Sequence, residues 1–189
     1  EQVDVASTSS GHTPLHEAVA GTKCLAAAKL LLSKGADPCA VDPRDGGMAP
    51  LHQAVDNGVE PIALELLASG ADVRGKTAAE GLTPLHLAAR GGHDALARLL
   101  IARGGDVNAR ANDGRTPLHL AAKHGRENTA KILLDNGADA KAKDKKFLTA
   151  DYEAAKAKHP RVVELILGPK DERKTPAPKK KQRSERKNR

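Results

Sequence analysis

Short apolar stripes at helical spacing recur along this chain, and polar residues with glycine separate them. In the clearest copy, Leu118 and Ala121 belong to one stripe, and Ala130 and Leu133 belong to a second. Apolar residues three and four positions apart are typical of an amphipathic helix. The pattern therefore predicts units of two short helices joined by a turn.

The residues around each stripe suit helix ends. Thr116 precedes Pro117, and this pair favours a helix start. The threonine hydroxyl can accept a hydrogen bond from a backbone amide in the first turn of the helix. Proline suits the first helical position because it has no amide hydrogen that would need a partner there. Gly125 and Gly137 follow the two stripes and suit the left-handed residue that ends a helix. A stretch rich in Gly, Asp and Asn leads to the next unit, and we expect it to form a turn or hairpin finger.

The unit recurs at nearly constant spacing. Copies of Thr-Pro-Leu-His, or Ala-Pro-Leu-His in the second case, begin at Thr13, Ala49, Thr83 and Thr116, so the steps are 36, 34 and 33 residues. A degenerate fifth copy begins at Thr149. No single unit can bury its stripe alone, so the units are expected to stack into one continuous core.

The repeated T-P-L-H-x-A signature resembles that of ankyrin-repeat proteins, over roughly residues 3–168. The resemblance implies an all-α solenoid of stacked helix-turn-helix units with projecting β-hairpin fingers, whose fingers and first helices bind other proteins. We expect an ankyrin-repeat domain at residues 1–168, with repeats at about 11–42, 47–77, 81–110 and 114–143, a degenerate cap at 147–168, and a disordered basic tail at 169–189.

Both ends of the predicted stack depart from the pattern. In the fifth unit Tyr152 takes the place of the histidine and Phe147 that of a finger glycine, and its polar surface is typical of a terminal capping repeat. At the start, residues 3–6 resemble the finger at residues 106–109, so we expect the chain to begin inside a finger, with room for further repeats upstream.

Composition changes this picture in three ways. Aromatic residues make up 1% of the chain, so Ala and Leu must form the core, as suits a stack of short helices. The net charge of +7 divides into a neutral body and residues 168–189, which hold ten Lys/Arg and three Asp/Glu. The body is itself polarised, since residues 1–81 sum to −5 and residues 82–167 to +5, and such asymmetry can steer a charged partner.

Candidate catalytic chemistry is sparse. Histidine recurs at the repeat period, as His16, His52, His86 and His119. A catalytic residue is needed once rather than once per unit, so we expect these rings to bond the capping Thr and nearby backbone, as the resemblance implies. Zinc-protease, nucleophile-elbow and phosphate-loop motifs are absent from the sequence. We therefore expect no enzyme, catalytic residue, metal site or cofactor.

The resemblance places partner contacts on finger tips and on the exposed ends of first helices. The residues at these positions are Arg44, Asp45, Met48, Asp56, Asn57, Glu80, Leu82, Arg90, Asn112, Asp113, Arg115, Lys123, His124, Lys145 and Lys146. Met48, Leu82 and also Leu148 are either partly exposed apolar contacts or simple packing. Asn108 lies at a finger position that asparaginyl hydroxylases modify in ankyrin-repeat proteins, or is a plain turn residue.

Localisation and partner class follow from the remaining features. Cys24 and Cys39 do not make a disulfide framework, which favours an intracellular protein, cytoplasmic and/or nuclear. No apolar run is long enough to cross a bilayer. The tail run of Lys179, Lys180, Lys181 and Arg183 resembles a nuclear import signal, or is a solvated basic tail. It lacks aromatics to stack on bases, which argues against specific nucleic-acid recognition.

Two classes of function remain open. The first is a non-enzymatic interaction module, an adaptor or scaffold that binds a partner protein as a monomer. The second is the targeting or regulatory region of a larger enzyme, such as a kinase, ubiquitin ligase or transferase, whose catalytic domain lies outside this sequence.

Overall fold

The computed structural model describes residues 12–20 and 24–168, and within these ranges the chain folds into ten α-helices and one short 3₁₀-helix. In chain order they are α1 (Pro14–Ala20), α2 (Leu25–Ser33), η1 (Pro43–Asp45), α3 (Pro50–Asp56), α4 (Glu60–Ala68), α5 (Pro84–Gly91), α6 (Asp94–Ala102), α7 (Pro117–Lys123), α8 (Glu127–Asp135), α9 (Ala150–Lys156) and α10 (Pro160–Leu167). The prediction of an all-α repeat solenoid is confirmed. The predicted tail and import signal lie outside the described residues.

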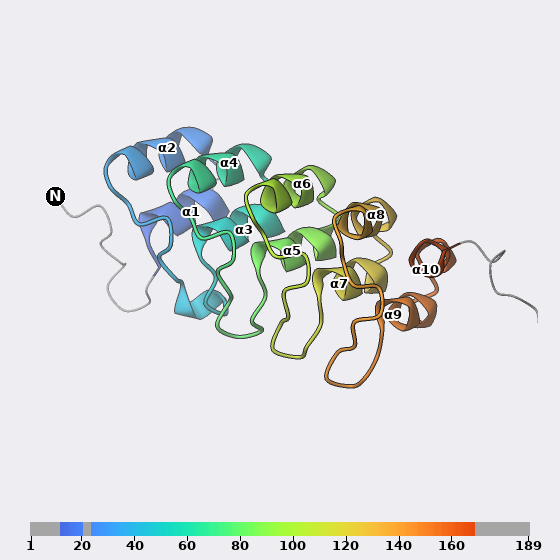
Figure 1. Cartoon of the computed structure of the whole chain (residues 1–189). Coiled ribbons are helices and arrows are strands. Elements are labelled where there is room, and N and C mark those ends of the chain that lie inside the picture. The colour runs from blue at the N-terminus through green and yellow to red at the C-terminus, as the bar shows by residue number, and fades with distance from the viewer. Residues whose placement is uncertain (1–11, 21–23, 169–189) are drawn as a thin grey trace, which may run out of the picture.

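The helices form two rows. Figure 1 shows the first helix of each unit, α1, α3, α5, α7 and α9, in one row and the second helices in the other. Neighbours pack along each row, as α5 packs on α7 and α6 on α8. The connecting loops project beyond the row of first helices. We call these loops fingers 1 to 4, at residues 37–48, 72–82, 106–115 and 139–148.

One continuous apolar core runs through the stack. Leucines from the first helices, such as Leu85 and Leu118, are fully buried with leucines from the second helices, such as Leu100 and Leu133. The alanine pairs of the first helices, including Ala121 and Ala122, are also fully buried. Side chains this small let adjacent helices approach closely, so the sequence-based expectation of an Ala and Leu core is confirmed.

The recurrent histidine ties each unit to the next. His86 Nδ1 accepts the Thr83 amide at 3.2 Å and lies 2.9 Å from its hydroxyl, while Nε2 donates to Arg115 O at 3.1 Å in the following finger. His52 keeps only the amide bond to Ala49, since alanine has no hydroxyl, and its Nε2 donates to Gly75 O. The predicted structural role of these rings is confirmed, and the bond to the next unit was not anticipated.

The fingers are closed loops, and their β-hairpin form is not confirmed. Within the described residues no strand is formed, and a single isolated antiparallel bridge joins Asp42 and Met48. In each remaining finger one backbone bond joins the two flanks, such as Thr77 N to Leu82 O and Asp144 N to Leu148 O, both at 2.9 Å, and a second bond, such as Gly81 N to Thr77 O, lies within the turn. One closing bond per finger is too few to make a ladder, which explains the difference from the expectation.

Finger tips lie so close together that glycine is required at the contact. Gly47 has φ +72°, and a Cβ there would overlap Ala78 Cβ and lie 2.9 Å from Ala78 N. Gly70 has φ +92°, but a Cβ there would meet nothing within 4 Å. The two positions share backbone conformation and differ in crowding.

This contrast predicts unequal costs for two alanine substitutions. Gly70→Ala should lower the free energy of unfolding by about 1 kcal/mol, because L residues are strained at this φ. Gly47→Ala should cost about 2 kcal/mol more, since a backbone must also move. Chemical denaturation of both variants measures the difference, and equal costs would mean that the finger contact is loose.

Candidate partner-binding surface

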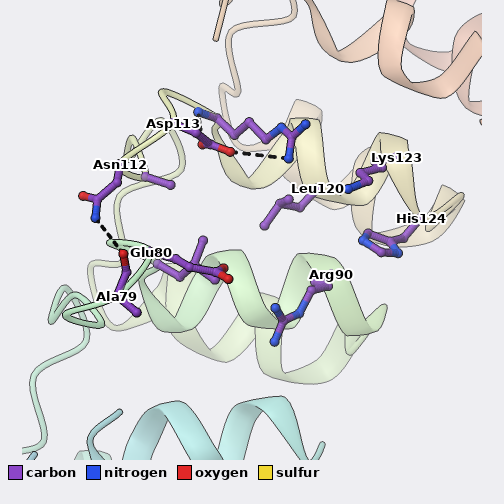
Figure 2. A pocket seen from close by; sticks show the side chains of 11 residues that line it. Ala79, Glu80, Arg90, Asn112, Asp113, Leu120, Lys123 and His124 are labelled. Atoms are coloured by element: carbon purple, nitrogen blue, oxygen red, sulfur yellow. Dashed lines mark hydrogen bonds and ion pairs between the residues drawn. The ribbon is translucent and has the colours of Figure 1, made fainter. Parts of the chain in front are cut away.

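A hollow of about 560 Å³ opens between α5, α7 and fingers 2 and 3. Figure 2 shows it with finger residues on one side and residues of both helices on the other. The hollow is lined by Ala79, Glu80, Leu82, Arg90, Ala111, Asn112, Asp113, Arg115, Leu120, Lys123 and His124. This is the largest of the hollows described along the solenoid, and we call it the central hollow.

Most of the sequence-predicted contact residues gather here. Eight of them line the central hollow, and Asp45 and Met48 line an adjoining hollow of about 200 Å³ that shares Glu80, Leu82 and Arg90. The predicted residues outside both hollows are Arg44, Asp56, Asn57, Lys145 and Lys146. Sequence reasoning missed Leu120, although it stands at the helix position that Gln53 occupies in the second unit.

Hydrogen bonds between fingers hold the rim in place. Asn112 Nδ2 donates to Ala79 O at 3.1 Å (Figure 2), and the Asn112 amide donates to Glu80 O at 2.9 Å. Asp113 Oδ1 accepts the Arg115 amide at 2.9 Å. The first two bonds join fingers 2 and 3 and the third holds the turn of finger 3, so the rim does not need to be ordered when a partner binds.

The floor of the central hollow is apolar and largely covered. Leu82 is 6% exposed and Leu120 is 7% exposed, and Ala111 lies beside them. Of the two alternatives, exposed contact or simple packing, the structure supports packing for Leu82. Its amide bonds the Thr77 hydroxyl and its carbonyl accepts the Thr77 amide, which closes the finger with the side chain directed inward. Met48 and Leu148 are partly buried.

Arg115 has a structural task that the sequence did not reveal. Its Nη2 donates to Glu153 Oε1 at 3.0 Å, and Asp113 Oδ2 lies 3.4 Å from Nη1. Glu153 is 5% exposed, and Arg115 Nε has no hydrogen-bond partner among residues 12–20 and 24–168. Arg115 thus joins the fourth unit to α9 through an ion pair with the buried Glu153, and its contact with a partner stays a prediction.

Asp144 completes this ionic cluster. Its Oδ2 lies 4.0 Å from Arg115 Nε, and its Oδ1 accepts the amides of Lys146 and Leu148. Burial alone would raise the pKa of Asp144, but the bonds from Leu148 and Lys146 outweigh it and lower the pKa below its usual value. The carboxylate therefore stays charged and holds finger 4 closed.

Both signs of charge remain available at the rim. Arg90 is paired with Asp56 at 2.9 Å, whereas Glu80 and Lys123 have no oppositely charged side chain within 4.0 Å among the described residues. Burial and the positive charges of Lys123 and Arg126 lower the pKa of His124, so its ring adds hydrogen-bonding capacity rather than charge at neutral pH. A partner thus meets one free anion and one free cation across an apolar floor.

Asn108 is exposed but is fully engaged with the next finger. Its Nδ2 donates to Gly137 O at 3.0 Å, and its Oδ1 accepts the Asp139 amide at 2.8 Å. Its hydroxylation stays a prediction. Cys24 and Cys39 are free thiols, and no group of three metal-ligating side chains occurs within residues 12–20 and 24–168. Over the same residues no helix is long and apolar enough to span a bilayer.

Comparison with known families agrees with the geometry. A family model of ankyrin repeats in three copies matches residues 51–144, and a single ankyrin-repeat model matches residues 10–43. The chain therefore belongs to the ankyrin-repeat family. Ankyrin repeats are protein–protein interaction modules, and the solenoid belongs to this class. A comparison with curated proteins gave no match.

Proposed function

We propose that this chain acts as a non-enzymatic adaptor or scaffold that binds a partner protein in the central hollow. The observation that carries the proposal is the combination found there: a preformed rim of joined fingers, an apolar floor, and two charged side chains of opposite sign without ion-pair partners among the described residues. Binding to a preformed rim loses little conformational entropy.

The chemistry of the hollow suggests the kind of segment that it holds. Leu82, Ala111 and Leu120 suit an apolar side chain, while Glu80 and Lys123 suit a flanking basic and a flanking acidic group. Both free thiols are compatible with a reducing compartment, so we place the interaction inside the cell, in the cytoplasm or nucleus.

Site-specific crosslinking tests this assignment. We expect a photoreactive residue at Lys123 or Glu80 to crosslink a partner captured from cell extract, because both side chains line the hollow. Lys123→Glu should then weaken that partner's binding about tenfold with unchanged thermal stability, since an exposed unpaired lysine contributes little to folding.

Lys131 provides the matched control. It is also an exposed lysine on a helix, α8, but it does not line the central hollow. A photoreactive residue there should give no crosslink, and Lys131→Glu should leave the affinity unchanged. Crosslinks at Lys131 with none at Lys123 would place the partner on the other face and refute the proposed site.

A further inference from the structure

Each finger tip is covered by the next finger, except the last. Ala79 N donates to Gly46 O, Asn112 N to Glu80 O and Lys145 N to Asp113 O, each at 2.9 Å. The accepting residue directly precedes a glycine in all three cases. In finger 4 the equivalent residue is Lys146, and no amide of the described residues donates to its carbonyl.

Phe147 occupies the glycine position of this open finger. A Cβ at Gly81 would overlap Asn112 Oδ1, and one at Gly114 would lie 2.9 Å from Lys145 N, so the following finger excludes any side chain there. Finger 4 has no following finger among the described residues, and Phe147 keeps the left-handed backbone, with φ +61°. Its side chain is 80% exposed, so neither backbone strain nor apolar exposure is offset by packing.

Tyr152 stands at the other position that normally contacts a following finger. The equivalent histidine of the fourth unit, His119, is 1% exposed and donates from Nε2 to Leu148 O at 3.1 Å. Tyr152 is 49% exposed and carries a hydroxyl that can make the same kind of bond. The whole chain has one Phe, one Tyr and no Trp, and both large aromatic residues lie where a following finger would pack.

The surroundings are positively charged. Lys145, Lys146 and Lys156 are exposed, and none has a carboxylate within 4.0 Å among the described residues. The carboxylates of Asp144 and Glu153 are buried and lie against Arg115. Asp151, beside Tyr152 on α9, is partly exposed, so it reduces the positive charge of these three lysines without cancelling it. A segment that carries acidic residues would therefore be attracted to this end of the stack.

We propose that the end face, made of Lys146, Phe147 and Tyr152, binds an acidic extended segment of another protein that takes the place of a following finger. One amide of the segment donates to Lys146 O, one carbonyl accepts from the Tyr152 hydroxyl, and an apolar side chain covers Phe147. The three interior finger contacts supply the template for this geometry. The end face lies apart from the central hollow, because none of its residues lines that hollow.

A peptide that copies an interior finger tests the proposal. The probe carries residues 77–83 of this chain, which supply the donor Ala79, between pairs of added aspartates, and its control carries added lysines instead. With isotope-labelled full-length protein, we expect millimolar acidic probe to shift the amide resonances of residues 145–152, and the lysine control to leave them in place.

Two variants separate binding from folding. Phe147→Gly should weaken the acidic probe about tenfold while keeping or raising the thermal midpoint, because glycine tolerates the positive φ. Leu30→Ala removes another exposed apolar side chain, on α2, and should change neither. The proposal is overturned if the probe shifts no resonance of the end face, or if Phe147→Gly binds it as tightly. It is also overturned if the full chain alone self-associates and Phe147→Gly abolishes this, because the occupant is then a second copy.

Discussion

Replacing Arg115 by leucine is expected to lower the free energy of unfolding by about 3 kcal/mol, because it leaves the Glu153 carboxylate buried without its cation. The double variant Arg115→Leu/Glu153→Leu should recover most of this loss. Chemical denaturation of the wild type, both single variants and the double variant forms a complete double-mutant cycle. Hydrogen exchange in α9 and α10 then reports whether the last unit detaches first.

The rescue is expected because the chain already contains the apolar alternative. Leu82 and Leu120 are separated by the same 38 residues as Arg115 and Glu153, and both leucines belong to the buried core. Asp144 should remain tolerated in the double variant, since two backbone amides still satisfy its carboxylate. A buried ion pair and a packed apolar pair can therefore serve the same interface between units.

Arg90 supplies the matched control for this experiment. It also pairs with an acidic residue of another unit, Asp56, but the two side chains are 33% and 39% exposed. Arg90→Leu should therefore cost no more than about 1 kcal/mol. If Arg115→Leu is as mild as Arg90→Leu, or if the effects at Arg115 and Glu153 simply add, the ion pair does not join the fourth unit to the last.

The repeat period explains why the fold was predictable from the sequence. His86 and its equivalents recur with the period of the unit, so a shared structural role follows before any coordinates are known. The alanine pairs and the leucine stripes follow in the same way. The residues that recur are the ones that every interface between units needs, and an internal repeat therefore identifies them in the sequence.

Features that occur once could not be predicted in the same way. Arg115 was expected to contact a partner, because the resemblance to ankyrin repeats places such contacts on the finger tips. Its role depends on Glu153, 38 residues away, and only the stacking register brings the two together. The sequence likewise left Leu82 open between an exposed contact and simple packing, and it is two bonds to Thr77 that close its finger and bury the side chain. The central hollow is a property of two units together, so no single repeat encodes it.

Acidification from pH 7 to pH 5 should destabilise the solenoid through its buried histidines. Burial lowers the pKa of His86 to about 4, and it also lowers the pKa values of His16 and His52. Between pH 6.5 and pH 4 the unfolded chain binds a proton at His86 that the folded chain excludes. Stability is therefore complete above pH 6.5 and falls as the pH is lowered through this window.

His86 alone should account for about 2 kcal/mol between pH 7 and pH 5, and His16 and His52 add to it in the same direction. Burial is the main cause of the lowered pKa of His86. In addition, Nδ1 accepts from the Thr83 amide while Nε2 donates to Arg115 O, so protonation of the ring would break the bond at Nδ1. Carboxylates such as Asp144, whose pKa is lowered, titrate at more acidic pH and do not confuse the result. Denaturation curves at pH 7, 6 and 5 measure the loss.

A variant without the ring separates this effect from general charge repulsion. His86→Asn should be less stable than the wild type at pH 7. Between pH 7 and pH 5, however, its free energy of unfolding should fall by about 2 kcal/mol less than that of the wild type. His124→Asn removes an exposed histidine and should retain most of the wild-type slope, because solvent screens its interactions. An unchanged slope in His86→Asn would show that the ring can be protonated without loss of the fold. The bond from Thr83 to its ring would then not oppose protonation, and the acid sensitivity would have to arise elsewhere in the stack.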